Sequence, residues 1–338
     1  MLTGANLPTR VLTKDPDLGT SEEPPTDRGV AGIDIVVVSH RTPDLVMDCV
    51  DAALAAHPGR VVVVDNASAD GTVDQVCGAF PDVDVLANER NVGFGTAVNQ
   101  GIASTSAPYV LVLNGDTTIE PALLDALVRH LDERPGVGLV GPVLRRTDGS
   151  LQHSTFHFPS FVDSVVAETG LQLLVLRIPG LRERFLRTWS HDRIRRVDWV
   201  VGAAFAVRRT AFDAVDGFDE DFFMYSEEVD LCRRLADAGH VVEFAPLGVV
   251  THVGEASARQ AAEEMERERQ RSAVRYLRKH ETPRRAVRLL RFLRAVTALR
   301  AGRDLAFGLL GTRHERSRRR HEARARWRQV LDPDLWKP

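Results

Sequence analysis

Short runs of β-branched, apolar residues alternate with helical segments through the first part of this chain. Residues 33–39 are apolar at nearly every position, and residues 60–65 contain four consecutive valines that end at Asp65. Strands of this composition are buried on both faces, as in a parallel sheet covered by helices. Further strands are expected at 83–86 and 109–113, and helices at 44–57, from about Gly93 and after Pro121. The alternation predicts right-handed βαβ units around a mostly parallel sheet, which is an α/β fold.

The composition divides the chain into three segments. Residues 1–31 are polar, contain several prolines and lack periodicity, which predicts a disordered N-terminal tail. Residues 32–257 carry the strand and helix signals of one globular domain, which ends with two short strands at 241–244 and 249–252. Residues 258–338 predict a basic, helical C-terminal extension.

Targeting and redox signals favour a cytoplasmic protein. The N-terminal residues show no secretion-signal pattern, and no apolar run reaches the roughly 18 residues of a transmembrane helix. Cys49, Cys77 and Cys232 lie far apart and match neither a disulfide framework nor a zinc-ligand spacing. They are expected to be reduced thiols.

The charges are distributed unevenly. Residues 271–328 contain 19 Lys and Arg against four Asp and Glu, although the net charge of the whole chain is −3. An acidic body with a basic, amphipathic tail favours an enzyme held at an anionic membrane surface. No nucleic-acid partner is expected, because the aromatic residues available for stacking on bases are scattered. The alternative is a solvated helix that packs on the catalytic domain or in a dimer.

Polar side chains follow two of the predicted strands at their carboxyl ends, where open α/β sheets bind ligands. Asp65 is a candidate contact for the base or ribose of a nucleotide, although a turn with a helix cap also explains it. Asn114, Gly115 and Asp116 end another strand. Mg²⁺ takes one or two carboxylates together with phosphate oxygens, so Asp116 is a candidate metal ligand. The alternative for this triplet is a solvated turn.

A glycine-containing segment, residues 91–95, precedes a predicted helix. Backbone N–H groups at the start of that helix are a candidate ligand contact, and tight packing explains the segment equally well. The glycine spacing does not match a dinucleotide-binding fingerprint.

An acidic cluster, Glu227, Glu228 and Asp230, follows the apolar segment 222–225, which contains Phe222, Phe223 and Tyr225. A carboxylate next to apolar surface has a raised pKa, which suits a general base. The alternative is a helix N-terminus enriched in acidic residues, which interact favourably with the helix dipole. His252 ends a strand, where a lone histidine is more often structural than a metal ligand.

Taken together and in this order, these motifs resemble family 2 glycosyltransferases of the GT-A fold. The nearest likeness is to bacterial rhamnosyltransferases that act on lipid-linked acceptors. The resemblance implies a Rossmann-like, mostly parallel sheet flanked by helices over residues 33–257, followed by the helical extension. It rests on the motifs at 36–40, 64–68, 91–95, 113–116, 202–205, 217–220 and 231–233, and on His252.

The resemblance also implies a role for each matching residue. The nucleotide sugar would contact Ser39, His40, Asp65, Asn66, Asn91, Gly93 and Asn114. Asp116 and His252 would hold Mg²⁺ or Mn²⁺ at the diphosphate. Glu228 would be the catalytic base, with Glu227 as the alternative. The acceptor would contact Gly202, Ala203 and Tyr225, and the poorly patterned segment 139–196 would complete its pocket.

Three positions depart from the pattern of the family. Glu228 stands where the family usually has an aspartate after a glutamate, which leaves open whether Glu227 or Glu228 takes the proton. Arg41 replaces an asparagine that is usual after the first strand, and Gly115 replaces a proline that is usual in the fourth motif. These changes loosen any inference about the donor.

The function that follows is inverting transfer of a sugar from a nucleoside diphosphate to a hydroxyl of a glycan or polyprenyl-linked acceptor, in cell-envelope polysaccharide synthesis. The leading donor is dTDP-L-rhamnose, and a UDP-sugar is the next candidate. Such an enzyme would work in the cytoplasm or peripherally at the inner face of the membrane. A nucleotidyltransferase would carry a glycine-rich motif with Arg and Lys after the first strand, and residues 39–42 do not supply it. A non-catalytic nucleotide-sugar-binding protein stays open if Glu228 cannot act as a base.

Overall fold

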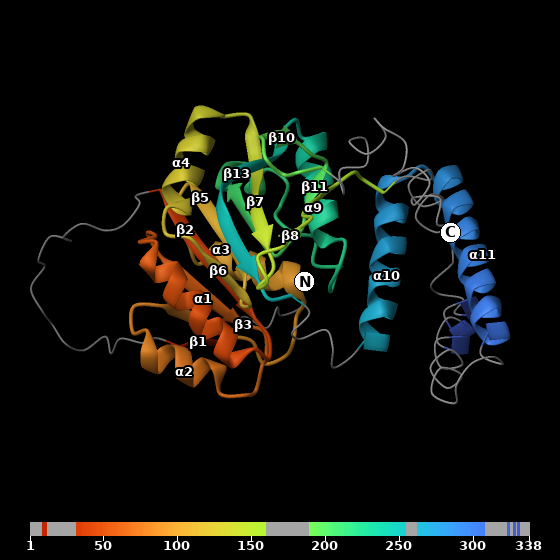
Figure 1. Ribbon diagram of the computed structural model, residues 1–338, viewed down its shortest axis with the longest axis horizontal. Coiled ribbons are helices and arrows are strands. Elements are labelled where there is room, and N and C mark those ends of the chain that lie inside the picture. Colours follow the sequence, from red (N-terminus) through yellow and green to blue (C-terminus); the bar gives the residue numbers. More distant parts are fainter. Residues whose placement is uncertain are drawn as a thin grey trace, which may run out of the picture. The chain divides into compact units, whose positions relative to one another are not determined.

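The computed structural model describes residues 9–11, 32–159, 189–254 and 262–307, and the short helical stretches 323–324, 327–328 and 330–331. These residues belong to two compact units (Figure 1). The first contains the sheet and its helices and includes residues up to Phe158, 189–223 and 227–254. The second contains Met224–Ser226 and the helices α10 (Ala262–His280) and α11 (Pro283–Phe307).

Four parallel strands form the part of the sheet that the sequence predicts. They are β2 (Ile33–Ser39), β3 (Val61–Asp65), β4 (Asp84–Ala87) and β5 (Tyr109–Asn114), in the order β4-β3-β2-β5. In the register of the sheet, Ser39 lies opposite Asp65 and Val38 lies opposite Asn114. The carboxyl ends of β2, β3 and β5 therefore meet at one edge of the sheet, as expected.

Beyond β5 the sheet becomes mixed. Strand β12 (Ala204–Arg208) runs antiparallel to β5 and to β7 (Val137–Arg145), and β13 (Val241–His252) runs parallel to β7. The sequence predicted two short strands at 241–244 and 249–252. The structure has one strand there, β13, and its register with β7 shifts between Phe244 and Val249. Pro246 lies in that irregular part, and proline has no N–H to give to a strand ladder. The chain therefore bulges there and continues to His252.

Helices cover both faces of the sheet (Figure 1). Three of them bury residues in the core on one face: α1 (Pro43–Ala55), α2 (Thr72–Ala79) and α4 (Leu123–Glu133). The other three bury residues on the opposite face: α3 (Phe94–Ala103), α8 (Arg209–Asp213) and α9 (Glu227–Asp237). This is the predicted arrangement of a mostly parallel sheet between helical layers.

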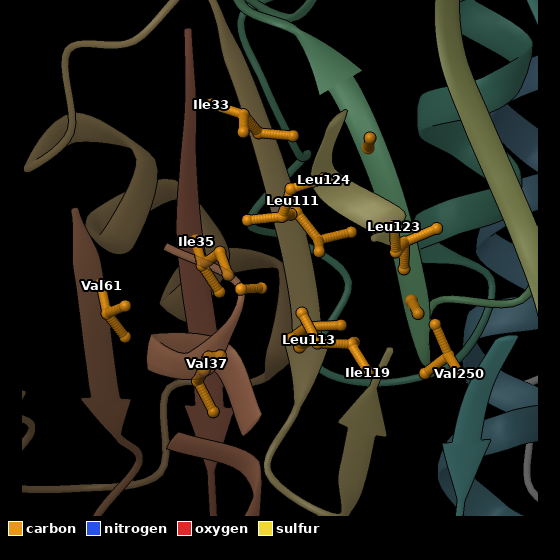
Figure 2. Close-up of a cluster of buried hydrophobic side chains, with 14 of the residues drawn as sticks. Ile33, Ile35, Val37, Val61, Leu111, Leu113, Ile119, Leu123, Leu124 and Val250 are labelled. Carbon is orange, nitrogen blue, oxygen red and sulfur yellow. The ribbon is translucent and has the colours of Figure 1, made fainter. Parts of the chain in front are cut away.

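Strand β2 contributes to both cores because successive side chains of a strand point to opposite faces. Ile33 and Ile35 belong to the core under α1 and α4, whereas Val36 belongs to the core under α3. Figure 2 shows the first of these cores, where Leu123 and Leu124 of α4 lie among the strand residues. Each fully buried side chain of this kind stabilises the fold by about 1.5–3 kcal/mol. Both layers therefore hold the strands whose ends carry the site.

Four two-residue strands lie within or just after the described parts of segment 139–196, which lacked a clear sequence pattern; residues 160–188 of that segment lie outside the described residues. They are β8 (Leu151–Gln152), β9 (Thr155–Phe156), β10 (Arg195–Arg196) and β11 (Trp199–Val200). β9 and β11 pair antiparallel with each other, and the ring of Phe156 stacks on that of Trp199 at 4.6 Å between centroids. This small sheet fixes the chain just before Gly202.

The N-terminal segment differs from the prediction at one place. Thr9–Val11 form strand β1, which pairs antiparallel with β4. An edge strand offers unpaired backbone groups, and Thr and Val suit a strand, so a short pairing forms although the segment lacks periodicity. Residues 1–8 and 12–31 of the expected tail lie outside the described residues, as does the expected boundary at 257.

Helices α10 and α11 lie within the segment expected to be basic and helical. Among the helices that the structure describes, none combines the length and the hydropathy required to cross a bilayer.

Candidate functional site

Two of the candidate residues, Ser39 and Asn66, meet at the carboxyl edge of the sheet, next to Gly115. The Asn66 N–H donates to the Ser39 carbonyl at 2.8 Å, and the Gly115 N–H donates to the Val38 carbonyl at 2.8 Å. Ser39 is fully buried, and its Oγ has no hydrogen-bond partner within the part of the chain that the structure describes. An unsatisfied buried hydroxyl is costly, so this atom fits a bound polar ligand.

Gly115 is one of the departures from the family pattern, and the structure gives a reason for it. A Cβ atom at this position would lie 3.2 Å from the Val38 carbonyl oxygen and 3.3 Å from the Ser39 Cα. A proline here would also lack the N–H that bonds to Val38. Glycine therefore lets the strand end of β5 approach the strand end of β2.

Asp65 closes a turn as well as a strand. Its carboxylate accepts hydrogen bonds from the Ser68 N–H, at 3.0 Å, and from the Ser68 hydroxyl. The Ser68 Oγ in turn accepts the N–H of Arg41 at 2.9 Å, which ties this turn to the loop after β2. Arg41, Ala67 and Ala69 have positive φ angles, a strained conformation that occurs often at ligand sites. The turn and the nucleotide contact, which were alternatives, are compatible here.

Asn66 is the centre of the hydrogen bonds that join the two loops after β3 and β4. Its side-chain amide donates to Asn91 Oδ1 at 2.8 Å, and its Oδ1 accepts the N–H of Val92 at 2.9 Å. The ring of His40 contacts the Asn66 carbonyl oxygen at 2.9 Å. The described contacts of Asn66 and Asn91 therefore position loops, and His40 lies beside them at the same edge.

Gly93 begins the turn into α3, with a φ of 89°. A Cβ atom here would overlap the backbone of Phe223, and the N–H of Phe94 donates to the Phe223 carbonyl at 3.1 Å. The N–H of Gly93 donates to Asn91 Oδ1 at 2.9 Å. Two N–H groups at the start of α3 are thus engaged within the protein, so packing accounts for Gly93 better than anion binding at a helix N-terminus.

Asp116 and His252, the two expected metal ligands, lie side by side. His252 Nε2 is 3.3 Å from Asp116 Oδ1, and both side chains retain some exposure, 10% and 12% respectively. The other ring nitrogen, Nδ1, is 3.0 Å from Gln152 Oε1, which orients the imidazole. The Gly254 N–H donates to Asp116 Oδ2 at 3.2 Å.

This donor set fits a divalent cation that also binds phosphate oxygens. The described residues contain no group of three or more His, Cys, Asp or Glu side chains placed to hold a metal. One carboxylate, here that of Asp116, is nevertheless sufficient for Mg²⁺ when substrate phosphates and water fill its other positions. Asp116 and His252 would hold the ion, and Gln152 would orient the ring.

The acidic pair begins helix α9. Glu227 is 5% exposed, and the Oε2 atoms of Glu227 and Glu228 are both buried without a hydrogen-bond partner in the described residues. Burial raises the pKa of Glu228 to about 7, while backbone N–H donors, including that of Gly202, act to lower it. Burial and the neighbouring charge of Glu228 also raise the pKa of Glu227 well above its usual range. Glu228 as a whole residue is half-buried.

Gly202 lies against Glu228. A Cβ atom at Gly202 would be 3.8 Å from the Glu228 Cβ and 3.3 Å from Phe94 Cε1. Ala203 is 2% exposed, and its carbonyl accepts the Asn114 N–H at 2.9 Å, so its described contacts are structural. Tyr225 belongs to the second unit and has a φ of 67°.

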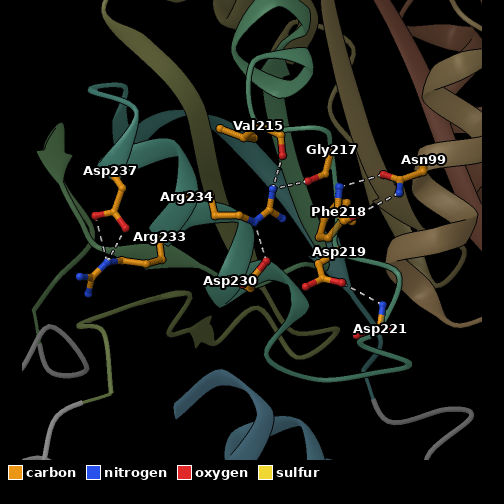
Figure 3. A network of polar contacts seen from close by, with 10 residues as sticks. All are labelled: Asn99, Val215, Gly217, Phe218, Asp219, Asp221, Asp230, Arg233, Arg234 and Asp237. Atoms are coloured by element: carbon orange, nitrogen blue, oxygen red, sulfur yellow. Dashed lines mark hydrogen bonds and ion pairs between the residues drawn. The ribbon is translucent and has the colours of Figure 1, made fainter. Parts of the chain in front are cut away.

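A polar network fixes the loop before α9 (Figure 3). Arg234 donates to Asp230 Oδ2 at 2.7 Å and to the carbonyls of Val215, at 2.5 Å, and Gly217, at 2.6 Å. Asn99 of α3 both accepts the Phe218 N–H and donates to the Phe218 carbonyl, each at 2.9 Å. The loop that carries Phe223 is therefore tied to α9 and to α3.

The sequence did not identify Gln152, Asn99 or Arg234. Gln152 lies in the segment without a clear pattern and 100 residues from His252. Asn99 and Arg234 each lie within or beside a motif of the family, at 91–95 and 217–233, and that proximity was the available signal.

A comparison with protein families decides the class of this site. The family model described as "Glycosyltransferase like family 2" matches residues 31–275, which include every candidate site residue. The chain belongs to glycosyltransferase family 2. The resemblance inferred from the motifs is thereby confirmed, and the site is that of a family of enzymes.

Curated relatives agree with the rhamnosyltransferase likeness. The N-acetylglucosaminyl-diphospho-decaprenol L-rhamnosyltransferase of Mycobacterium tuberculosis is 34% identical over 210 residues, which cover 58% of this chain and 66% of the relative. Rhamnosyltransferase WbbL of Escherichia coli is 26% identical over 220 residues, 63% of this chain and 80% of the relative. The match thus spans just under two thirds of the length of the mycobacterial protein.

Solved structures confirm the fold. The mannosyltransferase PcManGT from Pyrobaculum calidifontis, in complex with GDP-Man and Mn²⁺, covers 91% of this family 2 chain and 88% of its own, with a TM-score of 0.52. The two sequences are 16% identical, so this likeness concerns the GT-A fold alone.

Proposed function

We propose that this chain is an inverting, divalent-metal-dependent glycosyltransferase. It would move a sugar from a nucleoside diphosphate to a hydroxyl of a glycan or polyprenyl-linked acceptor in cell-envelope polysaccharide synthesis. The observation that carries the proposal is the pairing of Asp116 with His252 at the sheet edge that also holds Ser39 and Asp65. Family membership and the raised pKa of Glu228 support the same reaction.

In the proposed reaction, a hydroxyl of the acceptor attacks the anomeric carbon of the donor sugar. The new bond joins the acceptor oxygen to that carbon, and the bond from the carbon to the diphosphate breaks with inversion. Glu228 takes the hydroxyl proton, for which a pKa of about 7 is suitable. A bound Mg²⁺ or Mn²⁺ would neutralise charge on the departing diphosphate. Gly202, next to Glu228, would border the acceptor hydroxyl, with Ala203 and Tyr225 as further acceptor contacts.

The donor proposed is dTDP-L-rhamnose. The relatives from M. tuberculosis and E. coli are both named as rhamnosyltransferases, which supports this donor. The mycobacterial name also supports a polyprenyl diphosphate-linked acceptor, and with it a place at the inner face of the membrane. A UDP-sugar donor remains the alternative, as does a nucleotide-sugar-binding protein without catalysis.

A ligand-stabilisation experiment tests the donor and the metal together. Thermal unfolding would be followed with dTDP, UDP, GDP or CMP, each with and without Mg²⁺ or Mn²⁺. A nucleotide at a hundred times its dissociation constant stabilises the folded state by about 2.7 kcal/mol. We expect a metal-dependent rise in melting temperature with dTDP, and transfer of rhamnose from dTDP-rhamnose to a short-chain polyprenyl diphosphate sugar. Absence of any nucleotide effect would overturn the proposal, and binding without transfer would favour the non-catalytic alternative.

A further inference from the structure

Helix α11 has one exposed face whose chemistry changes along its length. Arg284, Arg288 and Arg291 follow each other at spacings of four and three residues, so they form one stripe, and all three are exposed. The same stripe continues through four exposed residues without charge: Ala295, Leu299, Gly302 and Ala306. Its first half is cationic, and its second half is apolar with the exposed Arg303, four residues after Leu299, at its edge.

The opposite face of α11 is buried. Ala286, Leu289, Leu290 and Ala301 are 5%, 3%, 2% and 0% exposed. Leu299, by contrast, is 73% exposed, and Leu305 beside the stripe is 51% exposed. Two large aliphatic side chains are therefore exposed at the C-terminal end of the helix, next to the stripe of arginines.

The charges on α11 are almost all positive. The helix contains seven arginines and a single acidic residue, Asp304. Asp304 is 5% exposed and pairs with Arg303 at 3.1 Å, so the exposed stripe carries no carboxylate. A surface that complements this stripe must offer anionic groups beside an apolar phase.

We propose that this stripe, residues 284–306 of α11, docks the protein on an anionic lipid surface, with the apolar half inserted and the arginines at the lipid phosphates. The proposal rests on the proposed function in so far as a lipid-linked acceptor places the enzyme at a membrane. Arg284 and Leu299 are 15 residues apart, about 22 Å along the helix axis. The helix would lie tilted, with Leu299 and Leu305 at the boundary of the acyl chains. Arginine stems can follow the surface while their guanidinium groups reach phosphate.

Two other occupants fit the stripe less well. A nucleic acid would leave the apolar half of the stripe without a contact partner, and the stripe offers no aromatic side chain for base stacking. A second copy of the helix in antiparallel orientation would bury each arginine against apolar residues without a partner. In parallel orientation it would place arginine opposite arginine. A lipid surface avoids both costs.

Flotation of the full chain with vesicles tests the proposal. We expect the protein to float at low salt with phosphatidylglycerol–phosphatidylcholine vesicles. With vesicles of phosphatidylcholine alone, it should stay in the bottom fraction of the gradient. Replacing Arg284, Arg288 and Arg291 by Gln should lower the partition coefficient about a hundredfold, since each basic residue near anionic lipid contributes about fivefold. Replacing Leu299 and Leu305 by Ser should also weaken flotation, with little change in its salt dependence.

A matched control distinguishes the effect of the stripe on vesicle binding from the effect of net charge. Arg129, Arg146 and Arg196 are exposed on the first unit, and their replacement by Gln changes the net charge equally. This control should float like the wild type. The proposal is overturned if the wild type does not float, if the control loses as much binding as the stripe variant, or if the stripe variant loses RNA binding or self-association instead.

Sugar transfer to a water-soluble acceptor, measured on the same proteins, tests the proposed function independently of the proposed lipid-binding stripe. Loss of flotation in the arginine variant with unchanged transfer is the expected result. Transfer without any flotation of the wild type would overturn the lipid surface alone. Flotation without transfer would support the surface and contradict the proposed function.

Discussion

Gly93 lies directly against the backbone of Phe223, and the N–H of the residue after Gly93 donates to the Phe223 carbonyl. This contact joins two loops that are 130 residues apart in sequence, one after β4 and one before α9. Replacing Gly93 by Ala should lower the free energy of unfolding by about 1–3 kcal/mol, because the added Cβ overlaps backbone and the φ angle is positive. Chemical denaturation measures this change in the free energy of unfolding. Gly78, which has nothing within 4 Å of an added Cβ, is the control and should tolerate Ala without loss.

Asp116→Asn should remove the metal dependence of nucleotide binding. The substitution preserves the shape of the side chain but removes the charge that faces His252 and the proposed cation. In the thermal unfolding experiment, the extra stabilisation that Mg²⁺ or Mn²⁺ gives to bound dTDP should disappear. Asp148→Asn, at an exposed turn, should leave it unchanged. An undiminished metal effect in Asp116→Asn would contradict the assignment of this residue.

Glu228→Gln should reduce sugar transfer by roughly 10²–10⁴-fold, the usual contribution of a general base, while nucleotide binding survives. In the wild type, kcat/KM should rise with pH through about 7, because Glu228 must lose its proton to act as the base. Glu228→Asp restores the residue usual in the family and should keep part of the activity. Retained turnover in Glu228→Gln, or an equal loss in Glu227→Gln, would show that the base is Glu227 or lies elsewhere.

Glu227 should make folding less favourable as the pH rises. Its pKa is raised in the folded state, so the folded protein holds the proton at pH values where the unfolded chain has lost it. Stability from this group is therefore greatest near about pH 4 and falls as the pH rises. Glu227→Gln should raise the free energy of unfolding at about pH 8, and the gain should vanish near about pH 4. A gain that is independent of pH would contradict this explanation.

The sheet and its edge could be predicted from the sequence because their signals are local. Runs of valine and isoleucine define β2 and β3, and polar residues mark where those strands end. The pairing of Asp116 with His252 followed only from the family resemblance, since a histidine at a strand end has no distinctive pattern. Gln152 could not be predicted, because β8 reaches His252 through a hairpin in a segment without periodicity. Packing between distant segments decides such contacts, and a single sequence does not record it.

The burial of Arg234 could not be predicted from the sequence either, because an arginine on a highly charged helix is usually exposed to solvent. The structure shows instead that Arg234 is largely buried, with its partner Asp230 at 0% exposure. Replacing Arg234 by Met should destabilise the protein by about 3–5 kcal/mol, because the Asp230 carboxylate would remain buried without its charge partner. The neighbouring Arg233 provides a matched control.

Arg233 pairs with Asp237 at the surface, at 3.1 Å and with side chains 34% and 58% exposed. Exposed pairs of this kind contribute about 0.3–0.5 kcal/mol, so Arg233→Met should have a small effect on the free energy of unfolding. Adding Asp230→Asn to Arg234→Met should recover part of the loss, since it removes the buried charge that Arg234 neutralises in the wild type. If the double variant is no more stable than Arg234→Met alone, the loss comes from the released carbonyls of Val215 and Gly217. Arg234 would then stabilise the loop before α9 through those hydrogen bonds rather than through charge.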